Sequence, residues 1–419
     1  MAATDRGEAT TPASGSRRLL AAVSTVDITP PVGYYLAGYA ARKEPSNALR
    51  DPLHGRLLLL DNGVTRLAIV TLDLIGLRRP TVLRARQAIA EAAGVQPDHI
   101  LLNWSHTHAG PEVERYETYV AQLADKLGGA ALAASRQMQP ASLAYAESTI
   151  DFNVNRRLPM PDGSVAMAPN PAGIVDRRLR LIRLDSNSAR PMAVLFHAVC
   201  HANALRHDNL AISADFPGLA QDLVATAFGP GCTPMFIQGC TGNLRANLPG
   251  EGGFRSADPE DLRWCGFSLG GAAISAAARA GTREAARLGD ELDAAEVLLS
   301  LPGRAGPAVE YPVQAMRLGN LLLIALAGEP VLEYGLALEA QCGGWLQVLV
   351  AGYSNASVGY LATPAIYAEG GYEGSPGASP FTPAAEAIVL QAGRDLAQRL
   401  AGGNLRPFSS TAATDAQNA

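Results

Sequence analysis

The sequence predicts an α/β (α+β) fold in which mixed β-sheets are layered with helices. The chain has 419 residues, of which 48% are hydrophobic and 17% are charged. At about 150 residues per domain, this length predicts one large domain or two of ordinary size, and it can bury a sizeable core. Short apolar runs alternate with helical periodicities along the whole chain, but several strand-like runs follow one another directly. We therefore expect mixed sheets rather than a doubly wound parallel sheet.

Short apolar runs bounded by turn residues predict the buried strands. In chain order they cover residues 55–60, 65–72, 100–104, 179–184, 192–196, 235–238, 320–325 and 345–350. Helical periodicity predicts helices over residues 80–93, 116–137, 217–228, 258–288, 330–341 and 382–401. Residues 1–17 and 406–419 are small and polar, which is typical of flexible tails. Residues 18–405 are then expected to form a single domain.

Charge and apolar patterning exclude several classes of protein. The chain carries 34 basic and 39 acidic residues, a net charge of −5, so bulk positive charge cannot drive nucleic-acid binding. No apolar run reaches the ~18 residues that a membrane helix needs. The apolar run at residues 19–23 is shorter than the core of a secretion signal, which is about 7–15 residues. We expect a cytoplasmic protein that acts on a small molecule, and homo-oligomerisation is left open.

The first candidate site is an H-x-H pair, His106 and His108, which follows the apolar strand at residues 100–104. Alternate residues of an extended chain point to the same side, so both imidazoles can reach one cavity. Imidazole is a common zinc ligand, which makes a metal one explanation for the pair. A pair of polar residues in a turn is the alternative.

The second candidate, His197 and His201, directly follows another apolar run. The spacing of four would put both on one face of a helix. Alternatively, one of them is a ligand and the other packs nearby.

Two further candidates come from the C-terminal third. Glu329 lies between a buried strand and the start of a helix, where a carboxylate is costly unless it is paired. It either binds a metal or caps the helix. Tyr360 and Tyr372 lie on a long glycine-rich stretch that includes a loop over residues 369–376. Such tyrosines commonly pack or lie on the surface, but a phenol can also bind a metal or donate to an oxyanion.

These pieces occur in the order in which a known family carries them. The matching segments are residues 26–31 (VDITPP), 36–39 (LAGY), Asp73, 105–111 (SHTHAGP), 212–218 (ISADFPG), 327–329 (AGE), 359–360 (GY) and 371–373 (GYE). Over roughly residues 20–400, the chain resembles the catalytic domain of neutral ceramidases, which are zinc amidases. Each motif is weak alone, but the ordered set is specific.

The resemblance implies a Zn²⁺ site and a set of catalytic residues. The zinc ligands implied are His106, His201, Glu329 and Tyr360. His108, Arg156 and Tyr372 match the residues that act on the substrate. The reaction implied is attack of a metal-activated water on an amide carbonyl.

Two positions depart from the family pattern. Asn243 and Arg245 replace the Asp and Ser of its Gly-Asp-x-Ser-Pro-Asn segment. The resemblance implies that this serine contacts the polar end of ceramide. We therefore expect Arg156, Arg245 and Asn243 to bind a small polar or acidic amide, N-acyl or lactam-like, instead of ceramide. A true ceramidase, a zinc hydrolase of esters or lactones, and a non-enzymatic metal-binding protein are the alternatives.

Overall fold

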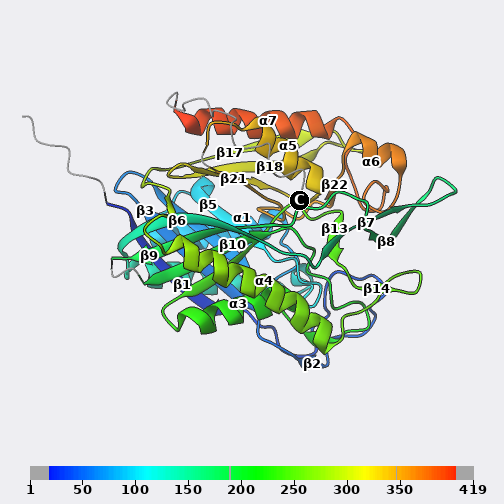
Figure 1. Cartoon of the computed structure of the whole chain (residues 1–419), viewed down its shortest axis with the longest axis horizontal. Helices are drawn as coiled ribbons and strands as arrows, with labels where there is room; N and C mark the ends of the chain where they lie inside the picture. The colour runs from blue at the N-terminus through cyan, green and yellow to red at the C-terminus, as the bar shows by residue number, and fades with distance from the viewer. Residues whose placement is uncertain (1–17, 188–189, 346, 403–419) are drawn as a thin grey trace, which may run out of the picture.

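The computed structural model describes residues 18–187, 190–345 and 347–402, which fold into four stacked layers (Figure 1). Two β-sheets face each other in the middle, and helices cover the outer face of each sheet. This architecture confirms the expected α/β class with mixed sheets. The tails predicted at residues 1–17 and 406–419 lie outside the described residues, and the single domain over 18–405 stays a prediction.

The larger sheet has nine strands, with eight in the order β12-β10-β9-β6-β1-β3-β4-β5 and β16 paired to β6. The β4/β5 and β10/β12 pairs are parallel, and the other pairs are antiparallel. The strands are β1 (Leu20–Asp27), β3 (His54–Asp61), β4 (Arg66–Leu72), β5 (Ile100–Trp104), β6 (Gln139–Thr149), β9 (Arg178–Ser186), β10 (Pro191–Ala198), β12 (Thr233–Gln238) and β16 (Ala286–Arg287).

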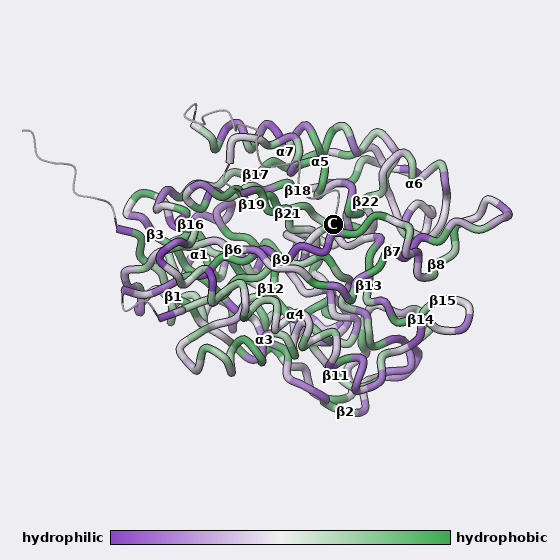
Figure 2. Tube along the Cα trace, viewed as in Figure 1, coloured by the Kyte–Doolittle hydropathy of each residue, from purple (hydrophilic) through white to green (hydrophobic). Residues whose placement is uncertain are grey.

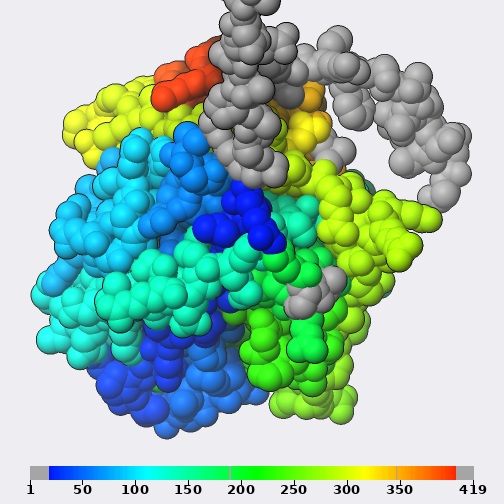
Figure 3. All heavy atoms as spheres, turned by 90° about the vertical axis from the view of Figure 1, so that its left-hand side faces the viewer, coloured from blue at the N-terminus to red at the C-terminus, as the bar shows by residue number. Residues whose placement is uncertain are grey.

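The smaller sheet has the order β17-β18-β19-β21, in which only β19 and β21 are parallel. It contains β17 (Leu292–Leu301), β18 (Val309–Leu318), β19 (Leu321–Leu326) and β21 (Gln347–Ala351). Its outer face is covered by α5 (Leu332–Gln341) and α7 (Ala385–Ala401). Figure 3 shows this C-terminal part, yellow to red, lying over the blue, cyan and green part of the chain.

Four helices cover the larger sheet. Helices α1 (Arg79–Ala93) and α2 (Glu117–Ser135) pack together over β3, β4 and β5, whereas α3 (Asp215–Phe228) and α4 (Pro259–Ala280) cover β9, β10 and β12. The remaining elements are short or lie beside the site: β2 (Ala48–Leu49), β7 (Asn153–Pro159), β8 (Val165–Asn170), β11 (Ala211–Ile212), β13 (Leu244–Ala246), β14 (Pro249–Gly250), β15 (Gly253–Phe254), β20 (Glu329–Pro330), β22 (Tyr360–Leu361) and α6 (Pro364–Glu369).

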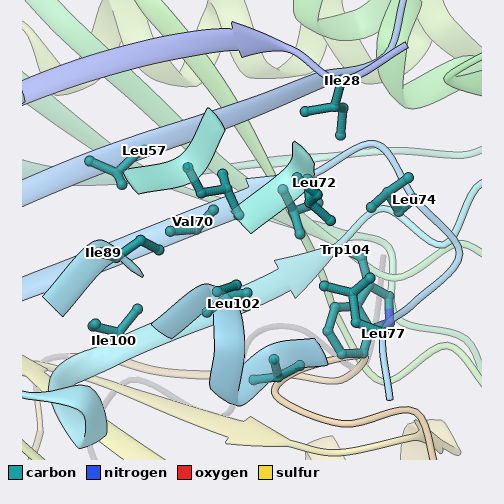
Figure 4. Packing of buried hydrophobic residues seen from close by; sticks show 14 of the residues in the cluster. Ile28, Leu57, Val70, Leu72, Leu74, Leu77, Ile89, Ile100, Leu102 and Trp104 are labelled. Atoms are coloured by element: carbon teal, nitrogen blue, oxygen red, sulfur yellow. The ribbon is translucent and has the colours of Figure 1, made fainter. Parts of the chain in front are cut away.

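Strand alternation divides the core between the layers. In β3, Leu57 and Leu59 face α1 and α2, while Leu58 and Leu60 face the second sheet. This is the period-two pattern of a strand buried on both faces. Figure 4 shows Leu57, Val70 and Leu102 of adjacent strands with Ile89 of α1 in one cluster. The hydrophobic colour in Figure 2 is concentrated in the central strands for the same reason, whereas α7 alternates between hydrophilic and hydrophobic residues.

Most predicted elements occur within a few residues of their expected positions, with two corrections. The helix predicted over residues 258–288 is too long, because α4 ends at Ala280 and Ala286–Arg287 pairs with β6 as β16. Strands such as β6, β17 and β18 were not anticipated. Strands β6 and β17 are partly exposed, and β18 is mostly buried but carries the polar residues Gln314 and Arg317. None of the three therefore has the continuous apolar run that marks a strand buried on both faces.

The carboxyl ends of the parallel strands of both sheets meet at one place. The Asn103 side chain in β5 donates to the carbonyl oxygens of Gln238 (3.3 Å) and Gly352 (2.8 Å), and its Oδ1 accepts from Gln238 N at 2.9 Å. This fully buried amide therefore ties the ends of β5, β12 and β21 together. Ligand sites in layered sheets commonly form beyond such carboxyl ends. No helix among the described residues is both long enough and apolar enough to span a membrane.

Candidate metal centre

His106 lies two residues beyond β5 in a strained backbone conformation. Its φ of 64° is in the left-handed region that residues other than glycine seldom adopt. Backbone bonding holds it there, since His106 N donates to Leu74 O at 2.9 Å. Nδ1 lies 2.6 Å from Ile75 O, and a carbonyl can only accept, so Nδ1 carries the proton. The lone pair of Nε2 is therefore free to bind a metal.

His201 reaches the same point from the end of β10. It is fully buried, and its backbone forms a parallel bridge with Arg245. Its Nδ1 lies 3.4 Å from both the carbonyl oxygen of Thr241 and the hydroxyl oxygen of Tyr353. A proton on Nδ1, directed at that carbonyl, leaves the Nε2 lone pair free, as in His106.

Glu329 follows β19 and pairs through β20 with β22, the strand that carries Tyr360. Its Oε2 lies 3.4 Å from His106 Nε2 and 3.9 Å from His201 Nε2. Burial raises the pKa of Glu329, but His106, Tyr360 and the charge of Arg156 together lower it below its ordinary value. The carboxylate is therefore ionised, although its buried Oε2 has no hydrogen-bond partner among the described residues.

Tyr360 joins the group through two polar contacts. Its side chain hydrogen-bonds Glu329, and its hydroxyl oxygen accepts from Arg156 Nη2 at 3.0 Å. Arg156 comes from β7 and also donates from Nε to Glu373 Oε1 at 2.8 Å. Arg156 and Glu373 are both buried, so the guanidinium is already paired with a carboxylate. Arg156 thus positions Tyr360, and its guanidinium is held by an ion pair within the protein.

These donors fit a divalent metal of the zinc type. Two ligands of one tetrahedral zinc, each about 2.0–2.1 Å from the ion, lie about 3.3 Å apart. The 3.4 Å between His106 Nε2 and Glu329 Oε2 matches that separation. Imidazole nitrogens, a carboxylate and a phenol are suitable zinc donors, and the unpartnered Oε2 supplies the negative charge that such an ion requires.

His108 lies within ligand distance of the two other histidines of the candidate metal centre. Its Nε2 is 3.0 Å from His201 Nε2, and ligand atoms of His106, His108 and His201 all lie within 4.8 Å of one another. Burial, together with the neighbouring charges of Arg245 and Arg156, lowers the pKa of His108 well below its ordinary value. The geometry therefore offers His108 either as a further ligand or as a neutral imidazole facing the centre.

The remaining predicted residues lie around this group and differ in their exposure and hydrogen bonding. Tyr372 is 52% exposed, and its ring centroid lies 5.4 Å from that of Tyr360, so it stands at the open side. The side-chain amide of Asn243 is used internally: Nδ2 donates to Glu333 at 2.9 Å and Oδ1 accepts from Leu332 N at 2.9 Å. Arg245 is buried beside His201.

The alternatives left open for His197 and His201 are resolved by the structure. Residues 197–201 do not form a helix, because β10 continues to Ala198. His197 packs in the interior, with Nε2 3.1 Å from Val350 O, so it is the histidine that packs nearby, and the ligand role of His201 stays a prediction.

Sequence reasoning missed Tyr353 and the role of Glu373. Tyr353 has a φ of 50° and places its ring centroid 4.4 Å from that of His106. Its position just beyond β21 could have pointed to it, because His106 stands in the same position beyond β5.

Comparison with known proteins finds solved structures that share this fold and one short match in sequence. No protein-family model matches the chain. A neutral ceramidase of Mycobacterium tuberculosis is 36% identical over 110 residues, which are 25% of this chain and 17% of that protein's length. The crystal structure of neutral ceramidase from Pseudomonas aeruginosa superposes with a TM-score of 0.78 at 19% identity, over 94% of this chain and 76% of that one.

A second solved structure, described as a ceramidase complexed with C2, has the same TM-score of 0.78 at 19% identity and covers 96% of this chain and 78% of its own. The identity in both structural matches is low, so they establish the shared fold, and the mycobacterial match adds a local likeness in sequence. The chain is therefore neutral-ceramidase-like in its fold and in part of its sequence.

Proposed function

We propose that this protein is a zinc-dependent amidohydrolase that uses water to cleave an amide bond of a small polar or acidic substrate. The observation that carries the proposal is the convergence of His106, His201 and Glu329 from three strand ends, where Glu329 Oε2 is buried without a hydrogen-bond partner among the residues that the structure describes. Tyr360 completes the ligand set through its hydrogen bond to Glu329. The mycobacterial protein that matches in sequence is described as a neutral ceramidase, which supports amide hydrolysis.

The metal would supply Lewis-acid chemistry, lowering the pKa of a bound water toward ~7 and polarising the amide carbonyl. The chain's own residues supply the rest. Arg156 holds the hydroxyl oxygen of Tyr360 in place, and Glu373 holds Arg156. Their mutual burial keeps this arrangement fixed before substrate arrives, which is what preorganised catalysis requires.

His108 and Tyr372 are the residues that face the substrate in this proposal. His108 is a buried imidazole beside the centre, so it can accept a proton from water and deliver it to the leaving amine. Tyr372 stands at the open side, where its hydroxyl can donate to the oxygen of the reacting carbonyl. Loss of one such donor typically slows a reaction by about 10²–10³.

The test combines metal analysis with a substrate panel. We expect zinc to copurify with the protein, and we expect Glu329→Gln to lose it together with at least about 100-fold of the activity. Glu310→Gln is the control, since Glu310 is 68% exposed on β18.

The panel contains N-acyl amino acids, lactams, ceramide and esters. Hydrolysis of ceramide alone or of esters alone would favour the corresponding alternative. A protein that binds zinc but cleaves none of them would favour the non-enzymatic alternative.

A further inference from the structure

Eight arginines are buried among the described residues, and six of them are paired with a carboxylate. The pairs are Arg56–Asp73, Arg86–Glu296, Arg156–Glu373, Arg157–Glu373, Arg180–Glu339 and Arg183–Asp185. Within the described part of the chain, Arg42 and Arg245 have no carboxylate within 4.0 Å. Because an unpaired buried charge is costly, these two exceptions need an explanation.

Arg42 is satisfied by neutral acceptors. Its Nη1 donates to Ala37 O at 2.8 Å and to His108 O at 2.9 Å, and its Nη2 donates to Arg206 O at 3.0 Å. These bonds tie the segment that carries Arg42 to the backbone of His108 and Arg206. Arg42 therefore has a structural role that accounts for its burial.

Arg245 has no comparable set of partners. It is 3% exposed, yet among the described residues its guanidinium makes one hydrogen bond, from Nη2 to Asn203 O at 3.0 Å. Its Nε is buried without a partner. The guanidinium stacks over the Phe254 ring, with Cζ 4.3 Å from the centroid, which fixes its plane. The result is a rigid cation with free donors, the arrangement that binds a planar anion in two-point contact.

The groups near Arg245 add further positive charge and do not balance the charge of its guanidinium. Asp215 interacts electrostatically with Arg245, but its carboxylate accepts from Leu205 N at 3.0 Å and Phe216 N at 2.7 Å, so both of its oxygens are used by the backbone. Arg206 also has a buried Nε without a partner. Burial and the charges of Arg156 and Arg206 lower the pKa of Arg245 to about 10, which still leaves it cationic at neutral pH.

Arg245 is also placed next to the candidate metal centre. Its backbone bridges that of His201, and its charge acts on both His201 and His108. Tyr39 lies between these groups, with its hydroxyl 3.4 Å from the same Asn203 carbonyl oxygen and its ring 4.8 Å from that of His108. An anion held by Arg245 would thus lie close to any amide that reaches the three histidines.

We propose that Arg245 is a specificity-determining residue that binds the carboxylate of an N-acyl amino acid while its amide lies against the metal centre. This rests on the proposed function and names its substrate class. One carbon separates the carboxylate from the amide nitrogen in such a molecule, which suits the adjacency of Arg245 and His201. Hydrolysis breaks the acyl carbon–nitrogen bond, places the hydroxyl of water on the acyl carbon, and returns its proton to the amine.

The test compares N-octanoylglycine with N-octanoylglycinamide, whose primary amide is a neutral isostere of the carboxylate. We expect the unmodified protein to prefer the carboxylate in kcat/KM by at least about tenfold. Arg245→Gln should raise KM for N-octanoylglycine by about 10- to 100-fold, the usual effect of losing a charge-assisted hydrogen bond in a buried site. KM for the glycinamide should stay nearly constant, and Arg245→Lys should recover part of the preference. Arg283→Gln is the control, because Arg283 is exposed beyond α4.

A binding measurement separates failure of this inference from failure of the proposed function. Calorimetric titration with N-octanoylglycine needs no turnover, so binding that depends on Arg245 supports the inference even if no amide is cleaved. Equal kcat/KM for the two compounds in the unmodified protein overturns it, including when Arg245→Gln fails to fold. Equal losses for both compounds in a folded Arg245→Gln protein also overturn it, while leaving amide hydrolysis itself intact.

Discussion

Arg156 and Glu373 form a buried ion pair at 2.8 Å across 217 residues of chain, and the same guanidinium holds the hydroxyl oxygen of Tyr360. Glu373 also accepts from Arg157 at 2.7 Å. Burial raises the pKa of Glu373, but Arg156 and Arg157 together lower it below its ordinary value. The pair therefore stays charged and connects the glycine-rich loop to β7 and to the candidate centre.

Removing the carboxylate of this pair should be strongly destabilising. We expect Glu373→Gln to lower the free energy of unfolding by about 3–5 kcal/mol, because it leaves the Arg156 charge buried and unpaired. Glu369→Gln is the matched control: Glu369 also bonds Arg157 but is 57% exposed, so about 0–1 kcal/mol is expected. Urea unfolding at neutral pH measures both. Equal losses in the two variants would show that burial of the pair does not matter.

Metal affinity should depend on His106 and not on exposed histidines. We expect His106→Asn to weaken zinc binding by more than about 100-fold. Mutating a residue that only hydrogen-bonds a metal ligand already lowers metal affinity by about 10–100-fold. His207→Asn should bind zinc like the unmodified protein, since His207 is exposed. Competition with a coloured chelator gives the affinities. Unchanged affinity in His106→Asn would remove His106 from the ligand set.

Gly38 should be required for the position of His108. A Cβ at Gly38 would lie 2.3 Å from His108 Nδ1, whereas a Cβ at Gly33 would meet nothing within 4 Å. Both glycines have positive φ, 96° and 106°, so alanine strains the backbone at either position. We expect Gly38→Ala to lose about 100-fold in kcat through displacement of His108, and Gly33→Ala to keep its activity. Similar kcat values for the two variants would argue against a role for His108.

Acid sensitivity should come in part from His197. Burial and the charge of Arg180 lower its pKa to about 3, against an ordinary value of 6.5. The folded state keeps His197 neutral while the unfolded chain takes up a proton below pH 6.5. Stability is therefore full above pH 6.5 and falls by about 1.4 kcal/mol per pH unit down to pH 3.

Between pH 7 and pH 5, His197 should thus account for about 2 kcal/mol of lost stability. His197→Gln keeps an amide donor for Val350 O but does not titrate. Its free energy of unfolding should fall less than that of the unmodified protein over this range, as measured by urea unfolding at both pH values. Parallel pH profiles would exclude His197 as the titrating group.

The sequence by itself determined the layered α/β class, most of the buried strands and the residues that converge on the centre. Strands buried on both faces carry continuous apolar runs, so local composition reveals them. His106 and Glu329 each stand just beyond such a run, where local pattern and family resemblance agree.

The tertiary structure alone decided how these residues are used. Asn103 joins the ends of strands from both sheets, and Glu373 is matched to Arg156 from a distant strand. Neither contact has a local signature, since each depends on how the sheets stack. The sequence likewise cannot predict whether Arg245 has a counter-charge. Ion pairing depends on distances between side chains, and these distances are set only when the chain folds.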